Sequence, residues 1–188
     1  MPFVRNRLYS PGYPFGNEEG EDDRNRFRLE EKIKVMYQER VQLAVDLRKQ
    51  GYNCCQCVVG AFGDLYGFTR EQSLAMSSAF GHGIGGMKDI CGAAMGLFML
   101  AGLETGTTRP KDPEGQGRVN KLVQELAQEF VRRNGALRCG DLLALPKPPA
   151  PETPNPDAEG KYYLNPCILK IQIAAEIWCE TLDRLRKA

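Results

Sequence analysis

Apolar residues recur along most of the chain at steps of three and four, the spacing that places side chains on one face of an α-helix. The pattern is clearest over residues 29–51 and 167–186, and it resumes after Cys54, Thr69 and Val119. No segment shows the sustained alternation, with a period of two, that a half-buried strand requires. The pattern therefore predicts an all-α fold, a single-domain helical bundle of about five to seven helices.

One stretch, residues 90–103, is apolar on all sides and predicts a central buried helix. Residues 80–87, just before it, read FGHGIGGM and predict a loop, because each glycine inside a helix costs about 1 kcal/mol relative to alanine. This loop is either a tight turn between packed helices or a surface whose N–H groups approach a cofactor or an anionic sulfur. The glycines that we expect to line such a site are Gly81, Gly83, Gly85, Gly86 and Gly92.

Residues 1–28 mix proline, glycine and charge without helical spacing, so we expect an N-terminal arm before a helical, cysteine-rich redox domain over 29–188. The net charge of +1 predicts no attraction to nucleic acid or to a membrane surface. No apolar run suits a signal peptide or reaches the roughly 20 residues of a membrane span. We expect a cytoplasmic protein, and the exposed arm and apolar bundle are compatible with a homodimer.

Four of the seven cysteines stand where the pattern predicts the start of a helix. Asn53 is a good N-cap for a helix that begins at Cys54, and Cys91, Cys139 and Cys167 have similar positions. The positive end of a helix dipole favours a thiolate over a thiol by roughly 0.3–1 kcal/mol. We therefore expect these four cysteines to form one thiol site.

Three chemistries fit four thiolates in a reducing compartment. They could hold an iron–sulfur cluster, cycle in pairs between dithiol and disulfide, or bind a structural zinc ion. The spacing from Cys54 to Cys167 matches no compact ferredoxin or zinc-ribbon pattern, so it does not choose among them. A non-catalytic helical interaction module, with the cysteines as core residues, is the remaining alternative.

Other motifs are excluded by their context. The C-x-x-C of residues 54–57 lacks the βαβ surroundings of a thioredoxin site, and Val58 stands where covalent haem attachment needs histidine. The glycine run follows a helix rather than a strand, which excludes a dinucleotide-binding motif. We expect Cys55, Cys57 and Cys179 to pack in the core, although either of the first two could replace Cys54, and His82 to be a loop residue.

Several of these segments together resemble a known family. They are Tyr52-Asn53-Cys54, the glycine run 81–86, the CGAAMG element 91–96, and the later Cys139 and Cys167. This arrangement is similar to the redox-active proteins named for their C_GCAxxG_C_C pattern. The resemblance covers roughly residues 33–187.

The resemblance implies an α-helical fold with four functional cysteines, Cys54, Cys91, Cys139 and Cys167. The family is also similar to the cluster-bearing region of split-Soret cytochromes, where the corresponding cysteines hold a [2Fe-2S] centre. We therefore expect an iron–sulfur cluster, most simply [2Fe-2S], that exchanges electrons with a redox partner protein. A metal-free thiol–disulfide protein or sensor is the alternative that uses the same residues.

Overall fold

The computed structural model describes residues 23–144 and 166–187. Over these residues the chain forms helices and no strand, apart from one isolated bridge. The helices are α1 (Asp23–Lys49), α2 (Cys54–Phe62), α3 (Arg70–Ser77), α4 (Gly92–Thr105), α5 (Pro113–Asn134), α6 (Cys139–Ala144) and α7 (Pro166–Lys187), with short 3₁₀ turns η1 (Gly63–Tyr66) and η2 (Ser78–Phe80). The predicted all-α fold is confirmed.

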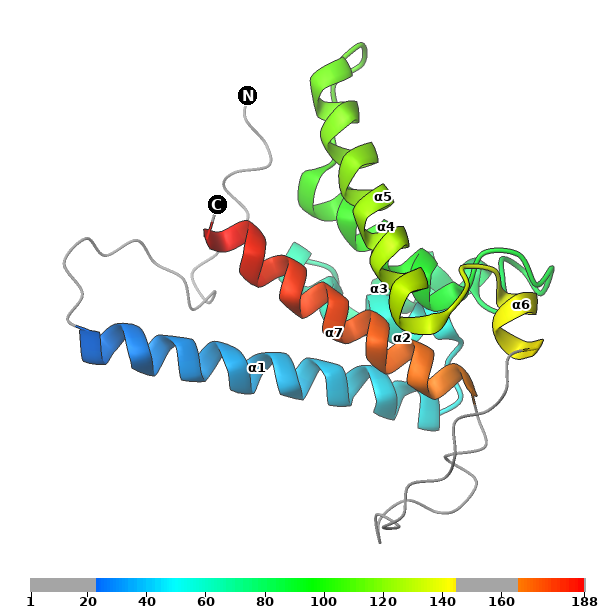
Figure 1. Ribbon diagram of the computed structural model, residues 1–188, viewed down its shortest axis with the longest axis horizontal. Helices are drawn as coiled ribbons and strands as arrows, with labels where there is room; N and C mark the ends of the chain where they lie inside the picture. Colours follow the sequence, from blue (N-terminus) through cyan, green and yellow to red (C-terminus); the bar gives the residue numbers. More distant parts are fainter. Residues whose placement is uncertain (1–22, 145–165, 188) are drawn as a thin grey trace, which may run out of the picture.

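The helices pack around a centre formed by α2 and α4, which contact each other and both contact α7 (Figure 1). α1 and α7 lie side by side and run in opposite directions (Figure 1). Every residue of α2 except Gln56 is buried, whereas α4 exposes Gly102. The predicted central helix is therefore buried as expected over much of its length, but α2 is the more completely enclosed of the two.

Helix ends follow the capping residues that the sequence contains. Asn53 accepts hydrogen bonds from the start of α2, and Thr69 does so for α3, each in a reciprocal capping box. Gly51 and Gly135 adopt left-handed φ angles of 98° and 88° just after α1 and α5, where a side chain would be strained. These local signals account for most of the boundaries.

Three boundaries differ from the prediction. α1 begins at Asp23 rather than near residue 29, and α5 begins at Pro113 rather than near Val119. In α5 the reason is local, since Asp112 accepts a hydrogen bond from the Gly115 N–H and proline suits the first helical position. Cys91 is the N-cap residue itself, so α4 begins at Gly92 and not at residue 90.

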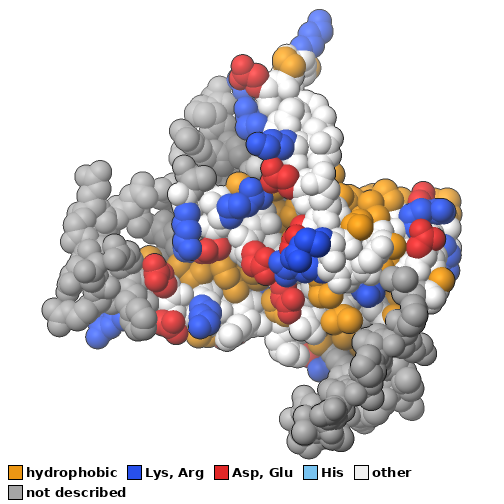
Figure 2. Space-filling view, viewed as in Figure 1, with side chains coloured by type: hydrophobic (Ala, Val, Ile, Leu, Met, Phe, Trp, Pro, Cys, Tyr) orange, Lys and Arg blue, Asp and Glu red, His pale blue; other side chains and the backbone are white. Residues whose placement is uncertain are grey.

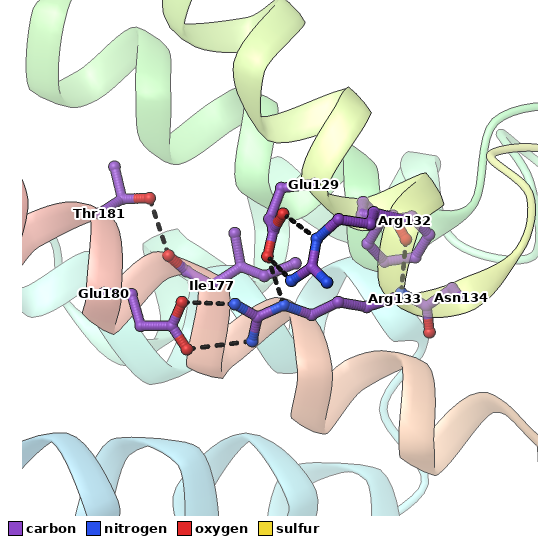
Figure 3. A network of polar contacts seen from close by, with 8 residues as sticks. Glu129, Arg132, Arg133, Asn134, Ile177, Glu180 and Thr181 are labelled. Carbon is purple, nitrogen blue, oxygen red and sulfur yellow. Dashed lines mark hydrogen bonds and ion pairs between the residues drawn. The ribbon is translucent and has the colours of Figure 1, made fainter.

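An ion-pair network fastens α5 to α7 (Figure 3). The Arg133 guanidinium donates to both carboxylate oxygens of Glu180 on α7 and to Glu129 one turn earlier on α5. Glu129 also accepts two hydrogen bonds from Arg132. The single tryptophan, Trp178, also lies on α7 and is fully buried, so its fluorescence can report on unfolding.

Residues 1–22 of the expected arm and residues 145–165 before α7 fall outside the described residues, whereas residues 23–28 form the start of α1. The division into an arm over 1–28 and a domain over 29–188 stays a prediction. Within the described helices, none combines the length and the apolar character needed to cross a membrane.

Candidate functional site

The start of α2 holds Cys54 in a fixed position. The Asn53 side-chain oxygen accepts hydrogen bonds from the N–H groups of Cys55 and Gln56, each at 3.1 Å. The Asn53 amide nitrogen donates to the carbonyl of Ser78, at 2.9 Å, and so joins α2 to the end of α3. The side chain of Cys54 points into the protein and is only 4% exposed.

Two short backbone segments bring Cys91 and Cys139 together. Cys91 N–H donates to the carbonyl of Leu137 at 2.9 Å, and Cys139 N–H donates to the carbonyl of Asp89 at 2.6 Å. An antiparallel bridge between Ile90 and Arg138 lies within this pairing. The segment before α4 is therefore bonded directly to the segment before α6, which the sequence pattern did not reveal.

The glycine-rich loop precedes this pairing and has a left-handed backbone. His82, Gly83, Ile84, Gly85 and Gly86 all have φ between 56° and 87°. Such angles are easy for glycine and unusual for a β-branched residue such as Ile84. The predicted loop is confirmed.

The five named glycines have unequal surroundings. A Cβ added at Gly83 would lie 2.8 Å from the Cβ of Cys139, and one added at Gly92 would lie 3.1 Å from the Cβ of Cys54. A Cβ at Gly81 would collide with Asn53. Gly85 and Gly86 make no such close approach. The first three glycines therefore allow the segments that carry the cysteines to pack tightly.

The four cysteines at these positions interact with one another. The Cys54 thiol donates a hydrogen bond to the sulfur of Cys167, which lies in the first turn of α7. Negative charge on Cys139 raises the pKa of Cys91, and negative charge on Cys167 raises the pKa of both thiols. Cys54, Cys91 and Cys139 are buried, and Cys167 alone is partly exposed. The structure thus gathers the four thiols in one region, with a single one accessible from outside.

The pKa values of the four thiols are strongly unequal. The hydrogen bond from Cys54 lowers the pKa of Cys167 to about 6. The same contact, together with burial, raises the pKa of Cys54. Burial raises the pKa of Cys91 to about 11, although the N–H groups of Ala93 and Ala94 oppose this, and it raises the pKa of Cys139.

The expectation that all four helix starts favour thiolates is therefore wrong for three of them. Burial disfavours a charge more than one helix end favours it. Only Cys167, which keeps some contact with solvent and accepts a hydrogen bond, follows the expectation.

Three cations act on the Cys167 sulfur, and sequence inspection missed all of them. Arg48, Lys88 and Lys170 each lower its pKa further. The Arg48 guanidinium is held by a 2.9 Å hydrogen bond to the carbonyl of Tyr52. Lys170 stands one helical turn after Cys167, a spacing that could have revealed it. The other two come from distant segments.

The other three cysteines and the single histidine have different surroundings from the four thiols described above. Cys55 contacts the sulfur of Met99 at 3.6 Å, the Cys57 thiol donates to the Tyr52 carbonyl at 3.5 Å, and Cys179 is buried. Burial raises the pKa of each of these three thiols to about 12. They pack in the interior as predicted, and His82 is exposed on the loop.

Comparison with family models decides the family. Residues 52–181 match the model described as "Putative redox-active protein (C_GCAxxG_C_C)". The chain belongs to this family. The match includes the glycine-rich loop and all four gathered cysteines. No curated protein and no solved structure gives a significant match.

The four thiols can be tested as ligands of a metal ion or an iron–sulfur cluster. In the part of the chain that the structure describes, no three side chains of His, Cys, Asp or Glu are grouped so as to hold one metal ion. The chemistry of the four thiols nevertheless suits a cluster, because N–H groups and nearby cations offset the charge of thiolate ligands. Cys54, Cys91, Cys139 and Cys167 would be the ligands.

Proposed function

We propose that this member of the redox-active family works by thiol–disulfide exchange, with Cys167 as the attacking thiol and Cys54 as the thiol that completes the disulfide. The observation that supports it most is the contact between these two side chains, one partly exposed and one buried. An accessible sulfur beside a protected one is the arrangement that a two-step exchange needs.

In the proposed reaction the Cys167 thiolate attacks one sulfur of a partner disulfide. That S–S bond breaks, a mixed disulfide forms, and the other partner sulfur leaves as a thiolate. The Cys54 thiol then loses its proton to solvent and attacks the Cys167 sulfur, which releases the second partner thiolate. Two electrons pass from the protein to the partner, which is reduced to a dithiol, and the reverse sequence oxidises it again.

An iron–sulfur cluster, most simply [2Fe-2S], is the second candidate, and the mutual interaction of all four thiols favours it. Cys54, Cys91, Cys139 and Cys167 would hold the cluster, and the lack of side chains at Gly83 and Gly92 allows close packing beside Cys139 and Cys54. When bound, the cluster would supply one-electron transfer to a redox partner protein. A reducing compartment such as the cytoplasm would suit either candidate.

Anaerobic purification separates the two candidates. The thiol proposal predicts a colourless protein with substoichiometric iron, zinc and sulfide, which forms one Cys54–Cys167 bridge after treatment with diamide. Peptide mapping by mass spectrometry identifies that bridge. Stoichiometric iron and labile sulfide, with visible absorption that dithionite bleaches, would contradict the proposal and support the cluster. A Cys179→Ser variant is the control, since it should behave as the wild type does in both assays.

A further inference from the structure

The three cations that lower the pKa of Cys167 also lack carboxylate partners in the part of the chain that the structure describes. Among the described residues, Arg48, Lys88 and Lys170 form no ion pair with a carboxylate, whereas Arg40, Arg133 and several other basic residues do. The Nε–H of Arg48 is buried and has no hydrogen-bond partner among the described residues. Positive charge therefore collects at the site without a paired carboxylate among the residues that the structure describes.

The position of Lys88 is set by the backbone rather than by its side chain. Its carbonyl accepts a 3.0 Å hydrogen bond from Gly140 N–H, and its own φ of 61° is left-handed. The neighbouring carboxylate of Asp89 lies 3.5 Å from Arg138 instead of pairing with Lys88. Lys88 is exposed to solvent, and its charge lowers the pKa of Cys139.

Exposed apolar side chains occur on the same three segments. Met87 is 69% exposed, Leu143 is 45% exposed and Leu169 is 37% exposed. Each lies within four positions of Lys88, Cys139 or Cys167 in the sequence, and only two other large hydrophobic residues in the described chain are as exposed. Figure 2 shows apolar and charged side chains mixed at the end of the molecule where Figure 1 places α6.

We infer that this surface binds a partner protein whose disulfide is flanked by carboxylates and apolar side chains. Cations that no described carboxylate pairs with would attract the partner's carboxylates, and the apolar side chains would contact a protein surface more extensively than they could contact a small disulfide. The surface is defined here by Met87, Lys88, Leu143, Leu169 and Lys170. The inference rests on the proposed function, since it names the substrate class of the same thiol.

The cations could serve only to keep Cys167 ionised, and the test must separate that role from recognition. At pH 8.5 we expect Cys167 to be largely a thiolate in the wild type and in the lysine variants, because its pKa in the wild type is lowered to about 6. A neutral reagent, iodoacetamide, then reports the reactivity of the sulfur alone. Any additional preference for an acidic disulfide reports recognition.

The experiment measures the first attack of reduced protein on two synthetic disulfide-linked peptides of equal length. One carries aspartates beside the cystine, and the other carries lysines. The wild type should react with the acidic peptide about tenfold faster at low salt, and 0.5 M NaCl should remove most of this preference. Lys88→Gln and Lys170→Gln should each reduce the preference about threefold, with nearly unchanged iodoacetamide rates.

Lys187→Gln is the matched control, because Lys187 pairs with Asp183 at the opposite end of α7 and should not affect the preference. A third peptide replaces the leucines beside the aspartates with serine. The leucine version should react several-fold faster with the wild type and lose that advantage with Leu143→Gln.

Equal rates for the acidic and basic peptides, or a preference that both lysine variants retain, would overturn the inference. Equal rates for the leucine and serine peptides would overturn its protein part and leave a small anionic disulfide as substrate. Both readouts concern only the first attack. Failure of the proposed function would instead be seen as a mixed disulfide that never resolves into a Cys54–Cys167 bridge.

Discussion

The Cys54 thiol at the start of α2 donates a hydrogen bond to the sulfur of Cys167 in the first turn of α7. One proton is thereby held between two sulfurs. The buried sulfur keeps it, and the partly exposed sulfur becomes a thiolate near neutral pH. In the proposed exchange this makes Cys167 the attacking thiol and Cys54 the buried thiol that completes the disulfide.

The reactivity of Cys167 should follow this hydrogen bond. Its alkylation by iodoacetamide should rise with an apparent pKa of about 6 in the wild type. Cys54→Ala removes the donor, so the apparent pKa should move upward, toward that of an ordinary thiol near 8.5. Mass spectrometry of the tryptic peptide gives the rates at each pH.

Cys179→Ala provides the control for that experiment, because Cys179 contacts the carbonyl of Tyr37 on α1 and not the reactive pair. Its profile should match that of the wild type. An unchanged profile in Cys54→Ala would show that another group stabilises the thiolate.

Buried thiols should make the fold sensitive to alkali. Burial raises the pKa of Cys55, Cys57 and Cys179 to about 12, whereas in the unfolded chain these thiols ionise near 8.5. Their contribution to stability is complete below the unfolded value and is lost as the pH rises toward 12. For each fully buried thiol the free energy of unfolding should fall by up to roughly 1.4 kcal/mol per pH unit above 9.

Urea unfolding at pH 8, 9 and 10, followed by Trp178 fluorescence, measures this loss. Cys179→Ala should show a shallower decline than the wild type, because one titrating thiol has been removed. Equal slopes in the two proteins would contradict the assignment. Below pH 9 the sign reverses for Cys167, whose lowered pKa adds stability that disappears as the pH falls through about 6.

Gly83 should tolerate no side chain. A Cβ there would lie 2.7 Å from the backbone of Lys88 and Asp89 and 2.8 Å from the Cβ of Cys139, at a φ of +74°. Gly83→Ala should cost about 2–4 kcal/mol and alter the alkylation of Cys139, because both backbone strain and a collision must be relieved.

Gly86→Ala is matched to that variant in the same loop. Gly86 has a φ of +87°, but a Cβ there meets nothing within 4 Å. It should cost only about 1 kcal/mol, the strain of a left-handed residue. Urea midpoints of the two variants test the difference, and equal losses would mean that the loop does not press against Cys139.

Asn53 should affect the thiol site as well as stability. Asn53→Ala removes the cap of α2 and the bond to Ser78, and should cost about 1–2 kcal/mol. It should also slow Cys167, because the Cys54 donor is no longer held in place. Thr69→Ala removes the equivalent cap of α3. It should lower stability by a similar amount and leave the Cys167 rate unchanged, and a loss of rate in both variants would point to general loosening.

Much of the helical framework could be predicted because its signals are local. The capping pairs Asn53–Gln56 and Thr69–Gln72 lie within one turn, and each side chain bonds to its own helix start. The glycine at 135 ends α5 through its own backbone angle. The start of α5 was missed although Asp112 and Pro113 are a local signal, because the apolar spacing begins later than the helix.

The amino-acid sequence by itself determined the all-α class and which four cysteines stand at helix starts, because capping and periodicity act over a few residues. It also determined the family, through the order of its cysteine and glycine motifs. Only the tertiary structure decided which thiols touch, which one reaches solvent and which cations face it. Pairing of Cys54 with Cys167, and of the Cys91 segment with Leu137, depends on helices distant in sequence packing into one core. At Cys54 the hydrogen bond to Cys167 and burial raise the pKa more than a helix start lowers it, and at Cys91 and Cys139 burial does so, whereas the partly exposed Cys167 has a lowered pKa. Desolvation depends on the whole fold and could not be predicted from local sequence.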